Sequence, residues 1–188
     1  MQALLIATVT VALAEIGDKT QLLALLLAAR YRKPGPIIAG MLVATLANHG
    51  ASAWVGAWMA TQISPQVLRW AVTLSFLAVA IWTLIPDKLD SNDVKPPRYG
   101  PFLATVIAFF LAEIGDKTQV ATIVLAANYS PLWQVITGTT IGMLLANVPV
   151  IILGARFAHR LPLRAARITA ALVFAALGLW VAWHGLSA

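Results

Sequence analysis

A nine-residue segment, Leu-Ala-Glu-Ile-Gly-Asp-Lys-Thr-Gln, occurs twice in this chain, at residues 13–21 and 111–119. Further identities continue at the same offset of 98 residues, and they include Gly40 with Gly138 and Trp82 with Trp180. Self-similarity at a fixed spacing is the signature of an internal duplication. Whatever fold the chain adopts must therefore be built from two similar halves.

Charged residues make up 11% of the chain and apolar residues 60%. In a soluble domain about a quarter of the residues are charged. A helix crosses the bilayer core with about 20 mainly apolar residues. The sequence therefore predicts an all-α membrane protein that contacts the lipid bilayer, with six transmembrane helices near residues 2–29, 36–60, 67–85, 101–127, 132–155 and 166–184.

Each half of the duplication holds three of these helices. The first repeat covers residues 1–85, a polar linker covers 86–100, and the second repeat covers 101–188. Because three is an odd number, the second repeat must enter the membrane from the side opposite to the first. Two inverted repeats are a recurring plan of transporters, whose binding sites lie near the membrane midplane between the repeats.

Basic residues are concentrated in the loops after the first, third and fifth predicted helices, whereas the opposite side holds only Arg69. Cytoplasmic loops carry the excess of Lys and Arg in membrane proteins. We therefore expect the linker in the cytoplasm and both termini on the extracytoplasmic side of the plasma or inner membrane. The ten basic residues on the cytoplasmic side are Arg30, Arg32, Lys33, Lys88, Lys95, Arg98, Arg156, Arg160, Arg164 and Arg167.

The chain has no cysteine, which excludes zinc–thiolate sites, iron–sulfur clusters and cysteine nucleophiles. Its pI near 10.2 does not indicate a nucleic-acid partner, because the basic residues lie in short loops between apolar runs. We expect no nucleic acid and no cofactor. The sequence favours no particular oligomeric state.

Four of the seven acidic residues lie in the two motifs, and the other three lie in the linker. A charged side chain at the centre of a membrane helix costs at least about 2.5–3.5 kcal/mol, so four of them demand a function. Residues three apart lie on one helical face, and inverted symmetry would bring the two faces together. Carboxylates around one point suit a hard divalent cation such as Mn²⁺, Ca²⁺ or Mg²⁺. The four acids are Glu15, Asp18, Glu113 and Asp116.

Other side chains could add neutral oxygens to such a site. Gly17 and Gly115 permit close helix approach or a local break that frees backbone carbonyls. The candidate neutral ligands within the motifs are Thr20, Thr118, Gln21 and Gln119.

Asn48 and His49 lie in the second predicted helix, and Asn147 lies in the fifth. Asn147 matches His49 at the offset of 98 residues, and it matches Asn48 after a shift of one residue. Asn48 and Asn147 are candidate ligands, although an intramembrane Asn also serves as a hydrogen-bonding contact between helices. His49 could carry protons or could be a buried structural histidine.

Lys19 and Lys117 each follow a motif glutamate by four residues and can pair with it. They could instead extend toward the membrane interface or enter the cation site, and the sequence leaves these alternatives open. Without any ligand, each Glu–Lys pair would be a neutralised packing contact. Packing, however, requires neither two identical motifs nor an excess of acid.

Two Glu-x-Gly-Asp-Lys-Thr motifs that open the two halves of a small six-span protein resemble the GDT family, which includes bacterial manganese exporters and Golgi manganese/calcium–proton exchangers. The resemblance covers the whole chain. It implies a cation/proton or cation/cation antiporter with Mn²⁺ or Ca²⁺ as its substrate. It also implies that the acids of both motifs are functional.

We therefore expect a secondary-active exporter of divalent cations, with Mn²⁺ first and Ca²⁺ second, that exchanges them for protons at a carboxylate site near the midplane. The chain has no nucleotide-binding loop, so the energy must come from an ion gradient. Two other classes remain. One is an exporter of organic cations or amino acids, and the other is a metal-dependent intramembrane enzyme, for which the sequence offers no nucleophile set.

Overall fold

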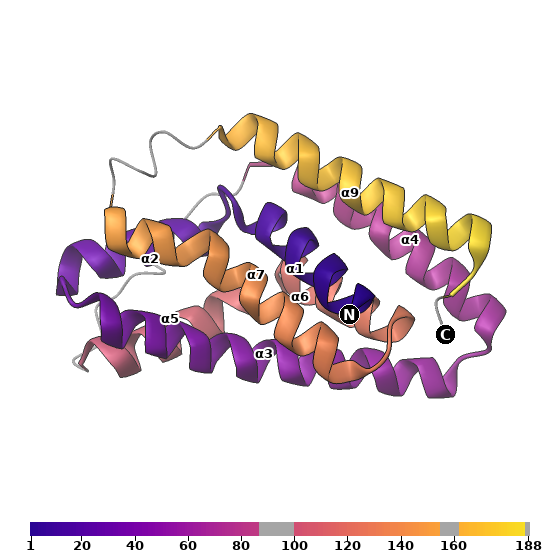
Figure 1. Cartoon of the computed structure of the whole chain (residues 1–188), viewed down its shortest axis with the longest axis horizontal. Coiled ribbons are helices and arrows are strands. Elements are labelled where there is room, and N and C mark those ends of the chain that lie inside the picture. Colours follow the sequence, from indigo (N-terminus) through magenta and orange to yellow (C-terminus); the bar gives the residue numbers. More distant parts are fainter. Residues whose placement is uncertain (87–99, 155–161, 187–188) are drawn as a thin grey trace.

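The computed structural model describes residues 1–86, 100–154 and 162–186, and every regular element in these ranges is an α-helix. The predicted all-α class is confirmed. Linker residues 87–99, with Lys88, Lys95 and Arg98, lie outside the described residues, and so do Arg156 and Arg160. The helices are α1 (Gln2–Glu15), α2 (Lys19–Tyr31), α3 (Pro34–Gln62), α4 (Pro65–Thr83), α5 (Pro101–Glu113), α6 (Lys117–Asn128), α7 (Leu132–Leu153) and α9 (Leu163–His184) (Figure 1).

Four of these helices, α3, α4, α7 and α9, are long and apolar enough to cross a membrane. Three of the helices, α3, α4 and α5, begin with a proline, which is favoured at the first helical position because it has no N–H to satisfy. The first and fourth predicted helices, 2–29 and 101–127, are wrong as continuous helices. Each is divided into two short helices, α1 with α2 and α5 with α6, which meet at the motif.

Large apolar side chains stay exposed along these helices, and all seven tryptophans are among them. Exposure of such a surface to water is unfavourable, whereas contact with lipid chains is not. Six of the tryptophans lie where α3 and α9 end and where α4 and α7 begin, and Figure 1 shows these helix ends together at one end of the bundle. The other end carries the exposed α2–α3 connection with Arg30, Arg32 and Lys33.

The two halves pack mainly against each other. Figure 1 shows α3 and α7 running in opposite directions, with α5 packed against α3 and α1 against α7. A Cβ atom added to Gly138 of α7 would lie 2.6 Å from the backbone oxygen of Leu4, and one added to Gly40 of α3 would lie 2.6 Å from that of Phe102. Gly40 and Gly138 are 98 residues apart, and so are Leu4 and Phe102, so the two contacts are equivalent in the two repeats. Small residues therefore let each long helix approach the first helix of the other repeat.

The helices α4 and α9 form a pair on one side of this core. The rings of Phe76 and Phe174 join them, with centroids 6.3 Å apart, and the guanidinium of Arg69 donates to the backbone oxygen of Ala182. The pair packs on the core through α4 against α6 and α9 against α1. It thereby covers the half of the core that α1 and α6 build.

Candidate cation site

The first motif breaks its helix with a tight turn. The N–H of Asp18 donates to the backbone oxygen of Glu15 at 3.1 Å, Ile16 has φ −66° and ψ 112°, and Gly17 has φ +83°. These values match a type II turn, which requires glycine at its third position because other residues rarely adopt a positive φ. Residues 113–116 repeat the turn, with Gly115 at φ +74°. The expectation that the Glu and Asp of one motif share a helical face is therefore wrong.

The motif glutamines support these turns. The turn removes the N–H of Gly17 from helical hydrogen bonding, and the side-chain oxygen of Gln21 accepts it at 3.0 Å. The side-chain oxygen of Gln119 accepts the N–H of Gly115 at 2.7 Å. Each bond replaces a helical hydrogen bond that the turn removes, so these bonds stabilise the break. The structure places both predicted glutamine ligands on the turns rather than toward the carboxylates.

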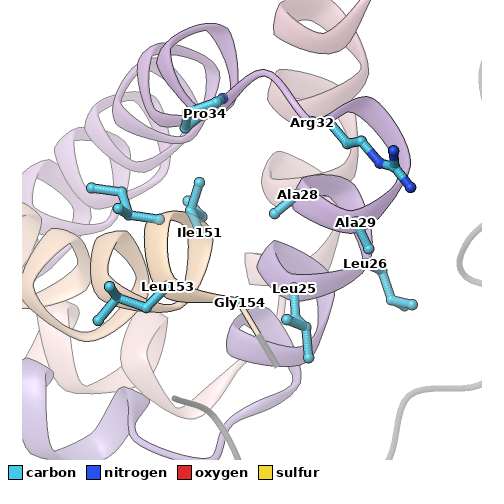
Figure 2. A pocket seen from close by; sticks show the side chains of 10 residues that line it. Leu25, Leu26, Ala28, Ala29, Arg32, Pro34, Ile151, Leu153 and Gly154 are labelled. Atoms are coloured by element: carbon cyan, nitrogen blue, oxygen red, sulfur yellow. The ribbon is translucent and has the colours of Figure 1, made fainter. Parts of the chain in front are cut away.

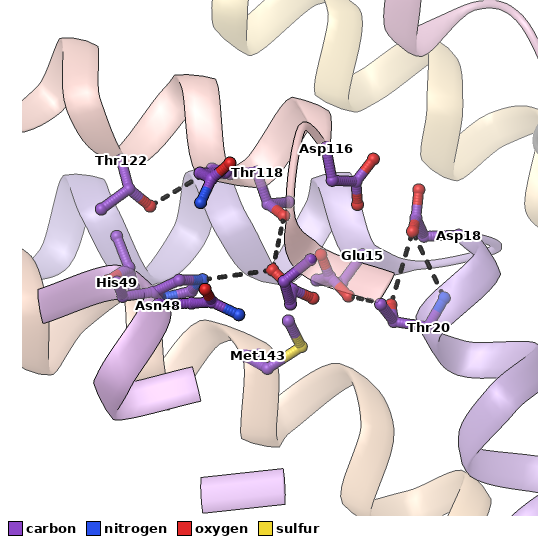
Figure 3. Close-up of polar contacts among 12 residues, drawn as sticks. Glu15, Asp18, Thr20, Asn48, His49, Asp116, Thr118, Thr122 and Met143 are labelled. Atoms are coloured by element: carbon purple, nitrogen blue, oxygen red, sulfur yellow. Dashed lines mark hydrogen bonds and ion pairs between the residues drawn. The ribbon is translucent and has the colours of Figure 1, made fainter. Parts of the chain in front are cut away.

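Glu15 and Glu113 end α1 and α5, and both side chains are fully buried. One oxygen of each accepts a hydrogen bond from the threonine of its own motif. Thr20 donates to Glu15 Oε2 at 2.5 Å and Thr118 donates to Glu113 Oε2 at 3.3 Å (Figure 3). The Oε1 atom of each glutamate has no hydrogen-bond partner within the described part of the chain. Buried carboxylate oxygens of this kind are suited to bind a cation.

Three acids from the two motifs converge at this place. Each of Glu15, Glu113 and Asp116 offers one carboxylate oxygen that lies within 4.8 Å of the other two. Asp116 is also buried, and its Oδ2 atom accepts no hydrogen bond from any described residue. Carboxylates this close repel one another unless a positive charge lies between them. An all-oxygen group of this type suits a hard divalent cation.

The fourth predicted acid, Asp18, binds a lysine from the other motif. Lys117 Nζ lies 2.7 Å from Asp18 Oδ1, and Lys19 Nζ lies 3.6 Å from Asp116 Oδ1. Of the alternatives that the sequence left open, the structure shows none as stated: each lysine pairs with an aspartate of the other motif, because the turn places the lysine at the start of a new helix. The two crossed pairs also differ in burial, since the Lys117 side chain is 2% exposed and that of Lys19 is 27% exposed.

The long helices complete the surroundings of the glutamates. Asn147 Nδ2 of α7 donates to Glu15 Oε2 at 3.3 Å, and His49 Nε2 of α3 lies 3.6 Å from Glu113 Oε2. Equivalent residues at the offset of 98 thus contact equivalent glutamates, each from the other repeat. Asn48 instead donates to a backbone oxygen of α5 at 3.0 Å. The ligands predicted from the sequence do not include His49. Its offset of 98 residues from Asn147, which is a predicted ligand, is the signal in the sequence that points to it.

The structure also has a pocket of about 590 Å³ between α2 and the end of α7 (Figure 2). Its lining is apolar apart from the Arg32 side chain and the backbone, and it includes none of the motif acids. This pocket is therefore not the place where a divalent cation would bind. The converging carboxylates are the candidate cation site.

Comparison with known proteins supports this chemistry. The profile of the family described as "Divalent cation/proton antiporter GDT1" matches residues 3–91 and 101–188. A Vibrio cholerae protein named "Putative manganese exporter" is 55% identical over 184 residues, which are 97% of this chain and 92% of that protein. "GDT1-like protein 5" of Arabidopsis thaliana is 28% identical and matches 89% of each chain. No solved structure matches the chain.

These matches cover nearly the whole chain, and they confirm the resemblance that the paired motifs indicated. The family is described as an antiporter family and the Vibrio protein as an exporter, so the chain is a transporter and not an enzyme. The exposed apolar helices agree with a multi-pass membrane protein. The chain belongs to the GDT1 family of divalent cation/proton antiporters.

Proposed function

We propose that this transporter exports Mn²⁺, and Ca²⁺ as a second substrate, in exchange for protons. The observation that carries the proposal is the convergence of Glu15, Glu113 and Asp116, which come from both motifs and are buried in the core. The similarity to a bacterial protein named as a manganese exporter favours Mn²⁺ over Ca²⁺.

The ligand types support this choice of metal. The buried side chains around the site offer carboxylate oxygens and the amide oxygen of Asn147, and the chain has no cysteine. Oxygen ligands favour Mn²⁺ and Ca²⁺, whereas Zn²⁺ and Cu²⁺ prefer nitrogen and sulfur. His49, 3.6 Å from Glu113 Oε2, adds an imidazole, the type of nitrogen that binds metal ions, to an otherwise oxygen-rich site. We therefore expect Mn²⁺ to be transported in preference to Zn²⁺ and Cu²⁺.

Proton exchange follows from competition for the same oxygens. A buried carboxylate without a positive partner must bind either a proton or a metal ion, because an isolated charge is costly in a dry interior. A site that gives up protons to receive Mn²⁺ on one side of the membrane, and does the reverse on the other, couples the two fluxes. The proton gradient would then drive export.

We infer that residues 1–85 and 101–188 are inverted repeats that cross the membrane six times in total, with the site near the midplane. The short helices of each motif would then be the halves of one broken span, as in other transporters with inverted repeats. The plasma or inner membrane is the expected location. Exposed Arg30, Arg32 and Lys33 favour the α2–α3 end as the cytoplasmic end, and the tryptophans at the opposite end suit the outer interface.

Transport by the purified protein in liposomes tests this function. We expect an imposed proton gradient to drive Mn²⁺ accumulation, Ca²⁺ to compete with Mn²⁺, and Zn²⁺ to compete poorly. Glu113→Gln should abolish the flux, whereas Lys33→Gln, on an exposed residue away from the acids, should leave it unchanged. Transport of Zn²⁺ without any response to Mn²⁺ would overturn the proposal.

A further inference from the structure

The two crossed lysine–aspartate pairs have the same residues and different geometries. Lys117 is buried at 2.7 Å from Asp18, whereas Lys19 is partly exposed at 3.6 Å from Asp116. The two motifs are identical in sequence over nine residues. The difference must therefore come from the arrangement of the helices around them.

The two turns differ in whether another helix packs on them. The start of α9 lies on the first turn, where a Cβ added to Gly17 would be 3.1 Å from Leu163 Cδ2. The residue equivalent to Leu163 at the offset of 98 is Pro65, at the start of α4. At Gly115, by contrast, an added Cβ would meet no described atom within 4 Å. The Lys117–Asp18 pair thus belongs to the covered turn, and the Lys19–Asp116 pair belongs to the open turn.

This asymmetry decides which aspartate is available to a cation. Asp18 is taken by the Lys117 ammonium and by Thr20, whose N–H and hydroxyl donate to Asp18 Oδ2 at 3.4 Å. Asp116 has the longer contact to its lysine, and it is the aspartate that converges with both glutamates. The cation group therefore contains two glutamates and one aspartate, while a lysine holds the other aspartate.

We propose that the two lysine–aspartate pairs alternate as the transporter changes the side to which its site is open. In the arrangement described above, Lys117 holds Asp18, and the substrate cation binds Glu15, Glu113 and Asp116. In the arrangement with the roles of the two repeats exchanged, Lys19 holds Asp116, and Asp18 joins the glutamates in its place. Each lysine is thus a built-in cation that competes with the substrate for one aspartate. The inference rests on the proposed function and assigns a role to residues which that function does not use.

Substitution of Lys117 by Gln tests this competition. If the lysine competes with the cation, the variant should bind Mn²⁺ more tightly but transport it more slowly. Mn²⁺ should bind to the purified Lys117→Gln protein about tenfold more tightly, since a nearby positive charge is removed and Asp18 becomes available. Mn²⁺ turnover in liposomes should fall by about tenfold or more, because tighter ground-state binding slows release. Lys19→Gln should behave alike, and Lys117→Arg should keep wild-type affinity. The control Lys33→Gln should change neither quantity.

A purely structural role for Lys117 predicts weaker binding together with slower transport, and that result would overturn the proposal. Unchanged binding and turnover in Lys117→Gln would overturn it as well.

If Lys117→Gln fails to fold, the double variant Asp18→Asn/Lys117→Gln, in which both charges are removed, replaces it. This double variant should bind Mn²⁺ through Glu15, Glu113 and Asp116 but should not transport it, and loss of binding by the folded double variant would contradict the alternation. Absence of Mn²⁺ transport by the wild-type protein would instead overturn the proposed function, and this inference with it.

Discussion

His49 and Asn147 occupy equivalent positions in the two repeats although their side chains differ. Each contacts the buried glutamate of the other repeat, at 3.6 Å and 3.3 Å respectively. The feature that the two side chains share is an N–H group that can donate to a carboxylate. At these positions each glutamate thus faces a side chain that can donate, although the residue type differs between the repeats.

This equivalence predicts the result of two substitutions at position 49. His49→Asn should keep Mn²⁺ transport within a few fold of wild type, because Asn147 already serves the other glutamate with an amide. His49→Leu should lower transport by about tenfold or more, since it removes the polar group beside the buried Glu113 carboxylate, and a buried polar group that loses its partner costs about 1–3 kcal/mol. Equal loss in both variants, measured as Mn²⁺ flux in liposomes, would show that imidazole itself is needed.

The two turn glycines predict unequal effects on stability. Alanine at a positive φ costs roughly 1–2 kcal/mol at either position. Gly17→Ala should cost more than Gly115→Ala, because the new methyl group also meets Leu163. Thermal unfolding in detergent measures both losses. Leu163→Ala should bring Gly17→Ala to the level of Gly115→Ala, and no such rescue would argue against the contact at the first turn.

At the scale of elements, the sequence predicted the long helices well and the motif region poorly. The helices α3, α4, α7 and α9 follow from apolar runs that end near the expected residues. The sequence predicts a helix through each motif because the motif lies within a long apolar run, 2–29 or 101–127. A single glycine at a positive φ replaces that helix with a turn, and local spacing does not reveal it. The crossed pairing of lysines with aspartates depends on which helices meet, so no local pattern could predict it.

The close packing between repeats predicts that two helix glycines do not tolerate a methyl group. In Gly138→Ala and Gly40→Ala the new Cβ would lie 2.6 Å from a backbone oxygen of the facing helix. Overpacking of this kind costs about 1–3 kcal/mol, so the melting temperature and the transport rate should both fall. Gly50→Ala is the matched control, because its Cβ would meet no described atom within 4 Å. Equal behaviour of all three variants would contradict the packing.

At the scale of the whole molecule, the duplication and the loop charges predict a chain with both ends on the extracytoplasmic side. A reporter that is active only outside the cytoplasm should work when fused after Ala188. A reporter that is active only in the cytoplasm should work when inserted in the linker at residues 86–100. Activity of the cytoplasmic reporter after Ala188 would contradict the orientation. Its activity at both sites would contradict the inverted arrangement, because three spans in the second repeat put the linker and the C-terminus on opposite sides.

The sequence predicts four acids at the site and the structure brings three together, and this difference has a physical explanation. The sequence predicts all four motif acids as ligands, because intramembrane carboxylates are rare and costly. From the symmetry of the repeats we expect all four around one point, whereas the structure brings three together and pairs Asp18 with Lys117. The difference arises because the structure is asymmetric between its repeats. Two identical motifs cannot by themselves predict such a difference.

Both motifs together are proposed to build a single cation site. Calorimetric titration with Mn²⁺ of the purified protein and of its Glu15→Gln and Glu113→Gln variants can test this. We expect a single Mn²⁺ ion per chain in the wild type and loss of that binding in each variant, because each removes a ligand from the same ion. Binding of one ion per motif, or retention of wild-type affinity by either variant, would contradict it.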